Sequence, residues 1–595
     1  MRGGACACAL LLTLGPSLAT AGYIDHFATR DDIGKDKAPH FGTSHVLVLP
    51  VIVDEPGLPS EQALLQTAQP FFDPLAADGF TFSNYFRVAS LGRFEPVTTI
   101  APAVRFSECP FARDANGVCT IERGDVSALG PAVEAMQEIL ERADANIDFS
   151  QYDLNGAQTG ESDGIIDGFV LLTNINFGGI ALPLARICEL AVVGDLYCRE
   201  QGGLDRWEPV YDDVLVPWVA VSGSRSGQVD FAAHVSVHEF GHLLGFADLY
   251  DESGQTTDMP YSFMGGWYYD DMPDMPDAFS RYVIGWANPI QATGDATVTL
   301  RPAASSGDVL KLGTGREFFL VENRQAVGPY DGSIAEPGLV IFHVNLDERP
   351  SADPYGFVNT ITNCVNCQKW RPMLMVEQAD GLYELQSGPW KRDDSGDLFR
   401  SGDTFPEGDG GAPLSEATQE FNANRYDGSA TDIAVTNVAR LNDGEGQFSI
   451  AVEHPVLEDA CADLYCPTGM TCEAGRCLDV ASAEPDAEAS DGDSAEGSAA
   501  GDDDASGATA DAGGDASPDA GGSGSDAGDP AAAPSGAESH SPGASDAGSA
   551  GFESSEGLKE IPRRGCAAGE PPWVAAWGML WLFLRSRRKR SAQHR

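Results

Sequence analysis

Hydrophobic and polar residues alternate with different periods in different parts of the chain. Residues 45–53 are continuously apolar and rich in β-branched side chains, which is typical of a strand buried on both faces of a sheet. Residues 82–90 predict a helix that runs into a glycine turn and then a strand near 95–100. Residues 127–143 and 277–286 predict two further helices. Helices mixed with a buried strand predict an α/β (α+β) domain.

From about residue 297 the pattern changes to short apolar runs that alternate with polar residues and are separated by turns. These runs are residues 298–301, 317–323, 338–344, 373–377 and 447–452. Short, evenly patterned strands predict a second, β-rich domain that resembles a sandwich. We place the α/β domain at residues 22–295 and the β-rich domain at residues 296–456.

The C-terminal part of the chain has a different composition. Four cysteines between 461 and 477 predict a small module at 457–480 that is held by two disulfides. Residues 481–560 have almost no large apolar side chains and contain no Lys or Arg before Lys559, which predicts a disordered acidic linker. The net charge of −53 is therefore spread unevenly along the chain, and the milder acidity of the folded part indicates solubility or bound cations rather than a special partner. No basic, aromatic surface for nucleic acid is predicted.

The first 21 residues predict an exported protein. A charged start, a short apolar run and small residues at 19–21 are typical of a secretory signal peptide. In an oxidising compartment, cysteines that are close in sequence are expected to form local disulfides. The neighbouring pairs are Cys109/Cys119, Cys188/Cys198 and Cys364/Cys367, in addition to the cluster at 461–477.

Residues 561–595 contain Gly565-Cys566, then an apolar run at 571–584 and a basic cluster at 585–590. This order is similar to the MYXO-CTERM type of sorting tail. The resemblance implies processing near Cys566 and attachment to the cell surface. A weak membrane anchor is the alternative, because fourteen apolar residues are few for a spanning helix.

The stretch 238–248 carries the pattern His238-Glu239-x-x-His242-x-x-Gly245-x-x-Asp248. On a helix, His238 and His242 leave the same face one turn apart, so both imidazoles can bind one Zn²⁺. Glu239 then lies beside the open coordination position, where it can act as the catalytic carboxylate. Gly245 can end the helix in a left-handed conformation, and Asp248 becomes the third ligand. The alternative is a helix whose histidines only cap or pack.

Two residues downstream extend this hypothesis. Met264 lies in a glycine-rich turn after the zinc pattern, which resembles the Met-turn beneath the metal of metzincin proteases. Tyr268 follows this turn and is a candidate for stabilising an oxyanion near the metal, although it is equally compatible with an ordinary packed aromatic.

A second candidate metal site lies upstream. Carboxylates and an amide recur with glycines in a short stretch, which suits a cation that prefers oxygen, such as Ca²⁺. The residues are Asp148, Asp153, Asn155, Asp163 and Asp167. The alternative is a polar turn in which these side chains accept hydrogen bonds from the backbone.

Several stretches together resemble the immune inhibitor A family of secreted metallopeptidases. They are residues 84–92, 148–153, 238–251, 280–286, 321–324 and 338–343. The resemblance extends from about residue 45 to 454 and implies a zincin or metzincin-like catalytic domain, usually with structural calcium. It implies that His238, His242 and Asp248 are zinc ligands and Glu239 the catalytic carboxylate. Only residues 22–44 separate the signal from the first strand, so no large inhibitory propeptide is predicted.

The sequence therefore predicts a secreted or surface-attached zinc metalloendopeptidase that hydrolyses protein or peptide substrates. In this hypothesis Glu239 takes a proton from a metal-activated water. Two alternatives belong to other classes: a non-catalytic surface binding protein on a metalloprotease scaffold, and a zinc amidase that acts on a non-peptide substrate.

Overall fold

A computed structural model describes the folded part of the chain. The described residues are 38–75, 79–114, 116–120, 129–156, 160–176, 178–184, 209–224, 233–246, 248–249, 259–265, 273–326, 330–331, 334, 336–347, 366, 369–386, 396–415, 418, 421–467 and 469–479. The predicted signal peptide, acidic linker and C-terminal segment lie outside these residues, as do the cysteine pairs 188/198 and 364/367. The described residues all belong to one compact unit, Met1–Ser490.

The N-terminal region is built around a six-stranded sheet in the order β2-β1-β6-β10-β7, with β3 paired to β1. The strands β2, β1, β6 and β10 run parallel to their neighbours, whereas the edge strand β7 runs antiparallel to β10. The bounds are Gly42–Val53 (β1), Phe94–Ile100 (β2), Val104–Phe106 (β3), Gly168–Asn176 (β6), Gly179–Pro183 (β7) and Trp218–Ser224 (β10). Two small hairpins accompany the sheet: Ala112–Arg113 (β4) with Cys119–Thr120 (β5), and Val210–Tyr211 (β8) with Val214–Leu215 (β9).

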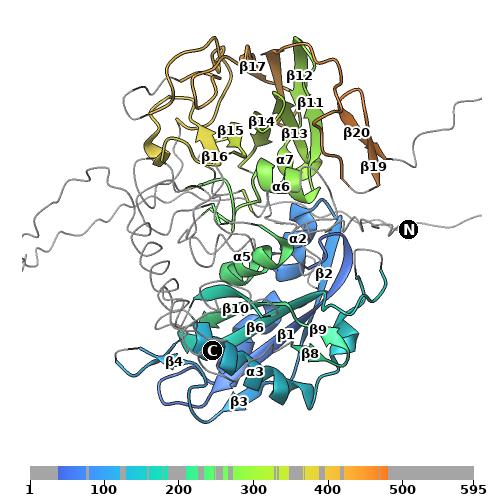
Figure 1. Ribbon diagram of the computed structural model, residues 1–595, viewed down its shortest axis with the longest axis vertical. Helices are drawn as coiled ribbons and strands as arrows, with labels where there is room; N and C mark the ends of the chain where they lie inside the picture. Colours follow the sequence, from blue (N-terminus) through green and yellow to red (C-terminus); the bar gives the residue numbers. More distant parts are fainter. Residues whose placement is uncertain are drawn as a thin grey trace, which may run out of the picture. The chain divides into compact units, whose positions relative to one another are not determined.

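Helices cover both faces of this sheet, which explains the continuous apolar run in β1. Val46 and Val48 join the core that also contains buried residues of α1, α2 and α5, whereas Leu47 and Leu49 join the core beneath α3. Figure 1 shows α2 and α5 over one face and α3 on the other. The bounds are Glu61–Phe71 (α1), Phe82–Ala89 (α2), Leu129–Asp144 (α3), Phe149–Tyr152 (η4, a 3-10 turn) and Ala233–Leu244 (α5). The chain is therefore mixed α/β, as the pattern predicts.

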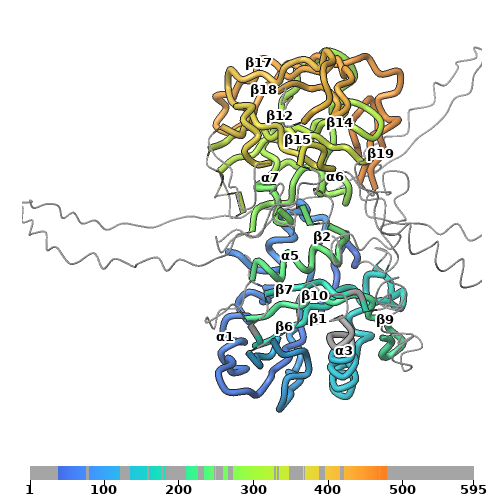
Figure 2. The backbone as a smooth tube through the Cα atoms, turned by 60° about the vertical axis from the view of Figure 1, so that its left-hand side comes forward, coloured from blue at the N-terminus to red at the C-terminus, as the bar shows by residue number. Residues whose placement is uncertain are grey.

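The β-rich region consists of a seven-stranded sheet in the order β16-β15-β14-β13-β11-β20-β19 and a three-stranded sheet β12-β18-β17. Apolar side chains from both sheets, such as Leu310 and Phe319 on one and Val298 and Ile450 on the other, share one core. The two sheets therefore pack face to face as a sandwich (Figure 2). The bounds are Asn288–Gln291 (β11), Ala296–Leu300 (β12), Asp308–Leu312 (β13), Glu317–Arg324 (β14), Gly338–Asn345 (β15), Leu374–Glu377 (β16), Ala434–Arg440 (β17) and Phe448–Glu453 (β18), with Ala278–Ile284 (α6), Ala303–Ser306 (α7) and Glu384–Gln386 (η6).

The two regions share a hydrophobic core. Phe318, Leu320 and Phe342 on the outer face of the seven-stranded sheet belong to the same buried cluster as Phe240 of α5. Strand β11 lies before residue 296 and pairs with β13, so the sheet crosses the boundary predicted at 295/296. The α/β region and the sandwich are thus joined by packing as well as by the chain.

Three disulfides are present among the described residues. Cys109 pairs with Cys119, as predicted from their spacing. In the C-terminal module Cys461 pairs with Cys472 and Cys466 with Cys477. The hairpin of this module, Met470–Glu473 (β19) and Arg476–Asp479 (β20), joins the edge of the seven-stranded sheet where Arg476 meets Ile290. Among the described residues, no helix has the length and apolar character that a membrane span needs.

Candidate metal centre

Helix α5 carries the predicted zinc pattern and packs on the six-stranded sheet, where it contacts β10, β7 and β6. It ends at Leu244, and Gly245 has the positive φ of 104° that was expected from the sequence. The amide of Gly245 donates to the carbonyl of His242, and the amide of Phe246 to that of Gly241. This pair of bonds is the Schellman arrangement, which ends the helix and turns the chain back.

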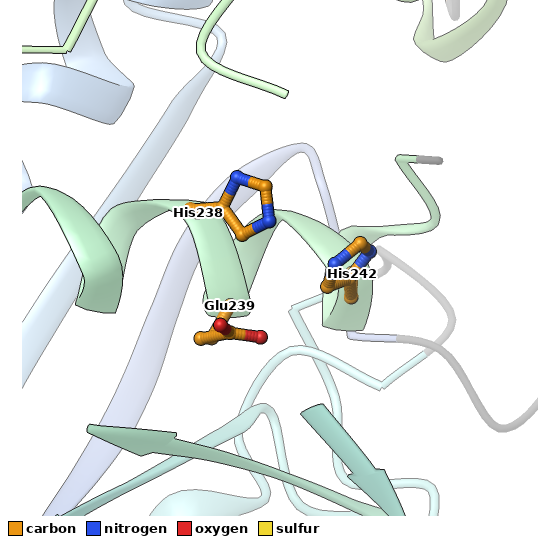
Figure 3. A group of neighbouring side chains, drawn as sticks. All are labelled: His238, Glu239 and His242. Atoms are coloured by element: carbon orange, nitrogen blue, oxygen red, sulfur yellow. The ribbon is translucent and has the colours of Figure 1, made fainter. Parts of the chain in front are cut away.

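The turn brings Asp248 to the two histidines. Its Oδ1 lies 3.0 Å from His238 Nε2 and 3.3 Å from His242 Nε2, and all three side chains are largely buried. The two imidazole centroids are 5.0 Å apart, and both rings leave the same side of the helix (Figure 3). Within the described ranges, His238, Glu239 and His242 form the one group of His, Cys, Asp and Glu side chains that could hold a metal ion, with ligand atoms within 4.8 Å of one another.

The far nitrogens of the two histidines determine their protonation. His238 Nδ1 lies 3.0 Å from the carbonyl of Phe263, and His242 Nδ1 lies 2.9 Å from the carbonyl of Phe246. Because a carbonyl oxygen only accepts, each Nδ1 is the protonated donor. In the neutral imidazole each Nε2 then has a lone pair directed towards Asp248. This carbonyl support is typical of metal-binding histidines, whose ring orientation it fixes.

This donor set fits a cation. Asp248 Oδ1 is buried and makes no hydrogen bond of good geometry, although two nitrogens lie near it. Three electron-pair donors that converge in a buried place repel one another unless a proton or a metal ion lies between them. Two imidazoles and a carboxylate are a ligand set that zinc accepts.

Without a metal ion, a proton takes this place. Burial alone would lower the pKa of His238, but the carboxylates of Asp248 and Glu239 outweigh burial and raise this pKa to about 9. Burial would raise the pKa of Asp248, yet its interactions with His242 and His238 outweigh burial and hold this pKa below its usual range. At neutral pH a metal ion must therefore displace a proton from His238.

Glu239 is on the side of α5 that faces the sheet and is 4% exposed. A Cβ atom at Gly179 of β7 would lie 2.5 Å from Glu239 Oε1 and 2.2 Å from a methyl carbon of Val235. The edge strand can therefore approach the helix this closely only because position 179 has no side chain. The sequence does not predict this role of Gly179, because an isolated glycine pair gives no signal of the contact.

Met264 lies directly beneath the histidine helix. It is fully buried, and a Cβ at Gly241 would lie 3.0 Å from its Sδ atom and 2.8 Å from the ring of Phe263. The Met264 carbonyl accepts from the amide of Leu249, next to Asp248. The turn that contains Met264 therefore contacts both parts of the zinc pattern. Tyr268 lies outside the described residues.

The residues of the predicted calcium site lie in one loop, but several of their oxygens already accept hydrogen bonds. Asp153 is buried, and its two oxygens accept from the amides of Asp163 and Gly164 and from the hydroxyl of Ser162. Asp163 is exposed and accepts from the amide of Ile165. These contacts are those of a polar turn.

The remaining members of this set behave in the same way. Asp167 accepts from the amides of His45 and Asn155, and burial, which outweighs these bonds, raises its pKa to about 6. Asp148 caps the turn that begins at residue 149, where it accepts from Ser150. Calcium at this loop stays a prediction, and the observed contacts favour the alternative of a turn held by backbone hydrogen bonds.

No protein-family model matches the chain, and a comparison with curated proteins found no match.

Proposed function

We propose that this protein is an exported zinc-dependent endopeptidase of the zincin or metzincin type, related to the immune inhibitor A family. The observation that carries the proposal is the convergence of His238 Nε2, His242 Nε2 and Asp248 Oδ1, with both Nδ1 atoms bound to carbonyls. His238, His242 and Asp248 would hold the zinc ion. When bound, zinc supplies Lewis acidity, which lowers the pKa of a water and polarises a carbonyl.

The protein's own groups account for the remaining chemistry. Glu239 follows His238 on the same helical turn and is nearly excluded from solvent, which suits a carboxylate that must take and return a proton. Gly179 leaves room for it against β7, and Met264 supports the helix from the other side. A binding protein would need no general base beside the ligands, so this placement favours catalysis. Export and tethering through residues 561–595 are part of the same proposal.

The substitution Glu239→Gln tests the mechanism. We expect it to lower casein hydrolysis by about 100- to 10,000-fold, because a general base is lost while the side chain keeps its shape. Zinc content, measured by atomic emission, and the melting temperature should stay at wild-type values. The matched control is Glu138→Gln on the exposed face of α3, which should leave both activity and zinc unchanged.

Other outcomes separate the alternatives. A Glu239→Gln protein with full peptidase activity would contradict the assignment of Glu239. A wild-type protein that binds zinc and cleaves small N-acyl amides but not casein would be a zinc amidase. Zinc binding with no hydrolysis of either substrate would indicate a binding protein. Activity that stops with a chelator and returns with zinc is the expected result.

A further inference from the structure

A buried network of ion pairs lies on the side of the sandwich that faces the metal centre. Arg324 at the end of β14 donates from Nε to Glu322 at 2.8 Å and from Nη1 to Asp331 at 2.6 Å. Arg281 of α6 pairs with the other oxygen of Glu322. All four side chains are at most 2% exposed. Removing one partner from such a network leaves a buried charge without compensation, so each member is expected to be costly to replace.

Arg324 and Arg281 differ in the backbone carbonyls to which they donate outside this network. Its Nη2 donates to the carbonyl of Tyr261 at 2.6 Å and to that of Pro276 at 3.1 Å. Arg281 instead donates to the carbonyl of Ala303, within the β-rich region. The planar guanidinium offers several donors in fixed directions, so a single side chain can bind two carboxylates and the 259–265 turn together.

The same turn is the one that contacts the zinc ligands. The Phe263 carbonyl accepts from His238 Nδ1 at 3.0 Å, and the Met264 carbonyl accepts from the amide of Leu249 at 2.8 Å. A second tether comes from Ser262, whose hydroxyl donates to Asp277 at 2.7 Å. The turn thus lies between Arg324 on one side and the metal ligands on the other.

We infer that Arg324 is a positioning residue for the zinc site: it fixes the 259–265 turn, whose carbonyls in turn orient His238 and hold the segment next to Asp248. The inference rests on the proposed zinc site. It means that the β-rich region contributes to metal affinity although none of the proposed ligands comes from it. It also gives a role to the stretch 321–324, which the sequence resemblance singles out without a function.

The test compares Arg324→Lys with Arg281→Lys. Both arginines are fully buried and share Glu322, so a merely structural role predicts similar effects for the two variants. The zinc dissociation constant is measured by competition with a chromogenic chelator, in the Glu239→Gln background to prevent self-digestion. Each variant is held well below its own melting temperature. We expect Arg324→Lys to raise the dissociation constant by about 10- to 100-fold, as for other outer partners of metal ligands. Arg281→Lys should stay near the parent value.

Equal weakening by both variants, or parent-like affinity in Arg324→Lys, would overturn the inference. If Arg324→Lys does not fold, Asp331→Asn provides the second variant, because it removes the negative charge that pairs with Arg324 Nη1 and leaves the arginine itself in place. It should weaken zinc binding in the same direction, and unchanged affinity would count against the role. A Glu239→Gln parent that binds no zinc would instead contradict the proposed function itself.

Discussion

In the described part of the chain, two places bring buried histidines and carboxylates together, and they differ in what the ring nitrogens face. In α5, His238 and His242 each give one nitrogen to a carbonyl and direct the other towards Asp248. In the sandwich, His343 of β15 has Nδ1 3.0 Å from Glu377 and Nε2 3.0 Å from Glu317. In the first arrangement the nitrogen that faces Asp248 can give up its proton to a metal ion, whereas in the second both nitrogens donate to glutamates.

The surroundings of His343 strengthen this difference. Its ring lies between Phe319 and Tyr426, with centroids 4.3 Å and 4.1 Å away, so no metal can reach a nitrogen without displacing a glutamate. Ionised carboxylates only accept, so two of them around one imidazole require the doubly protonated ring. The comparison teaches that His and Glu residues near each other do not define a metal site. The two places differ in the partner of Nδ1, which is a backbone carbonyl for His238 and His242 and a second carboxylate for His343.

The largest effect is expected on the zinc content, which should depend on His242 and not on His343. His242→Ala should reduce bound zinc from near one per chain to almost none and abolish peptidase activity, because one ligand nitrogen is lost. Far-UV circular dichroism should stay close to that of the wild type. His343→Gln is the matched control and should keep its zinc. Zinc lost from the His343 variant at a temperature where it is folded would make the two places equivalent and break the comparison.

A second prediction concerns stability and its pH dependence at His343. Burial alone would lower the pKa of His343, but Glu317 and Glu377 outweigh burial and raise it above its ordinary value of 6.5. Tyr383, which donates to Glu377, Tyr426, whose ring packs on the imidazole, and Arg425 are further ionisable groups around it. Because the folded state holds the proton more tightly, the stabilisation is complete below pH 6.5 and is lost as the pH rises through the raised pKa. The free energy of unfolding should fall by up to about 1.4 kcal/mol per pH unit in that window.

Urea unfolding of the zinc-loaded protein between pH 6 and 10 measures this effect. His343→Gln should lower the free energy of unfolding at pH 6 by about 3–5 kcal/mol, because two buried glutamates lose their cation. The difference between wild type and variant should shrink as the pH rises. A difference that stays constant over the whole range would show that His343 keeps its protonation state, contrary to this account.

The smallest effect is expected at the loop predicted to bind calcium. If Asp153 serves the backbone, Asp153→Asn should lower the free energy of unfolding by about 1–3 kcal/mol with or without calcium, because a buried amide loses its acceptor. Asp163→Asn, at an exposed position of the same loop, should have little effect. Thermal melts with calcium and with a calcium chelator measure both. A calcium-dependent shift in wild type that disappears equally in both variants would restore the calcium site.

Much of the local structure could be predicted from the sequence. The apolar run at 45–53 forms a strand that is buried on both faces, because its alternate residues point to opposite sides of the sheet and each side packs against an apolar core. The left-handed Gly245, the helix that contains His238 and His242, and the bridge between Cys109 and Cys119 follow from spacing within a few residues. The sequence does not predict the pairing inside the C-terminal module, because four cysteines in one short stretch allow more than one connectivity.

Side-chain contacts between segments that are far apart in the sequence could not be predicted. The carboxylates at 153 and 167 have the residue types of a calcium site, but only the folded loop shows that backbone amides reach them. Gly179 and Glu239 are sixty positions apart, and nothing in the local sequence indicates that they touch. The same holds for Arg324, which reaches the 259–265 turn from another sheet.

The sequence by itself determined which side chains are proposed as zinc ligands, because the pattern lies within eleven consecutive residues and a helix with a glycine end has few ways to arrange them. Only the tertiary structure decided how those ligands are oriented. The carbonyls that bind the far nitrogen of His238, the glycine that admits Glu239 and the arginine that holds the 259–265 turn come from other segments. Such contacts are set by packing between elements, which local periodicity does not encode.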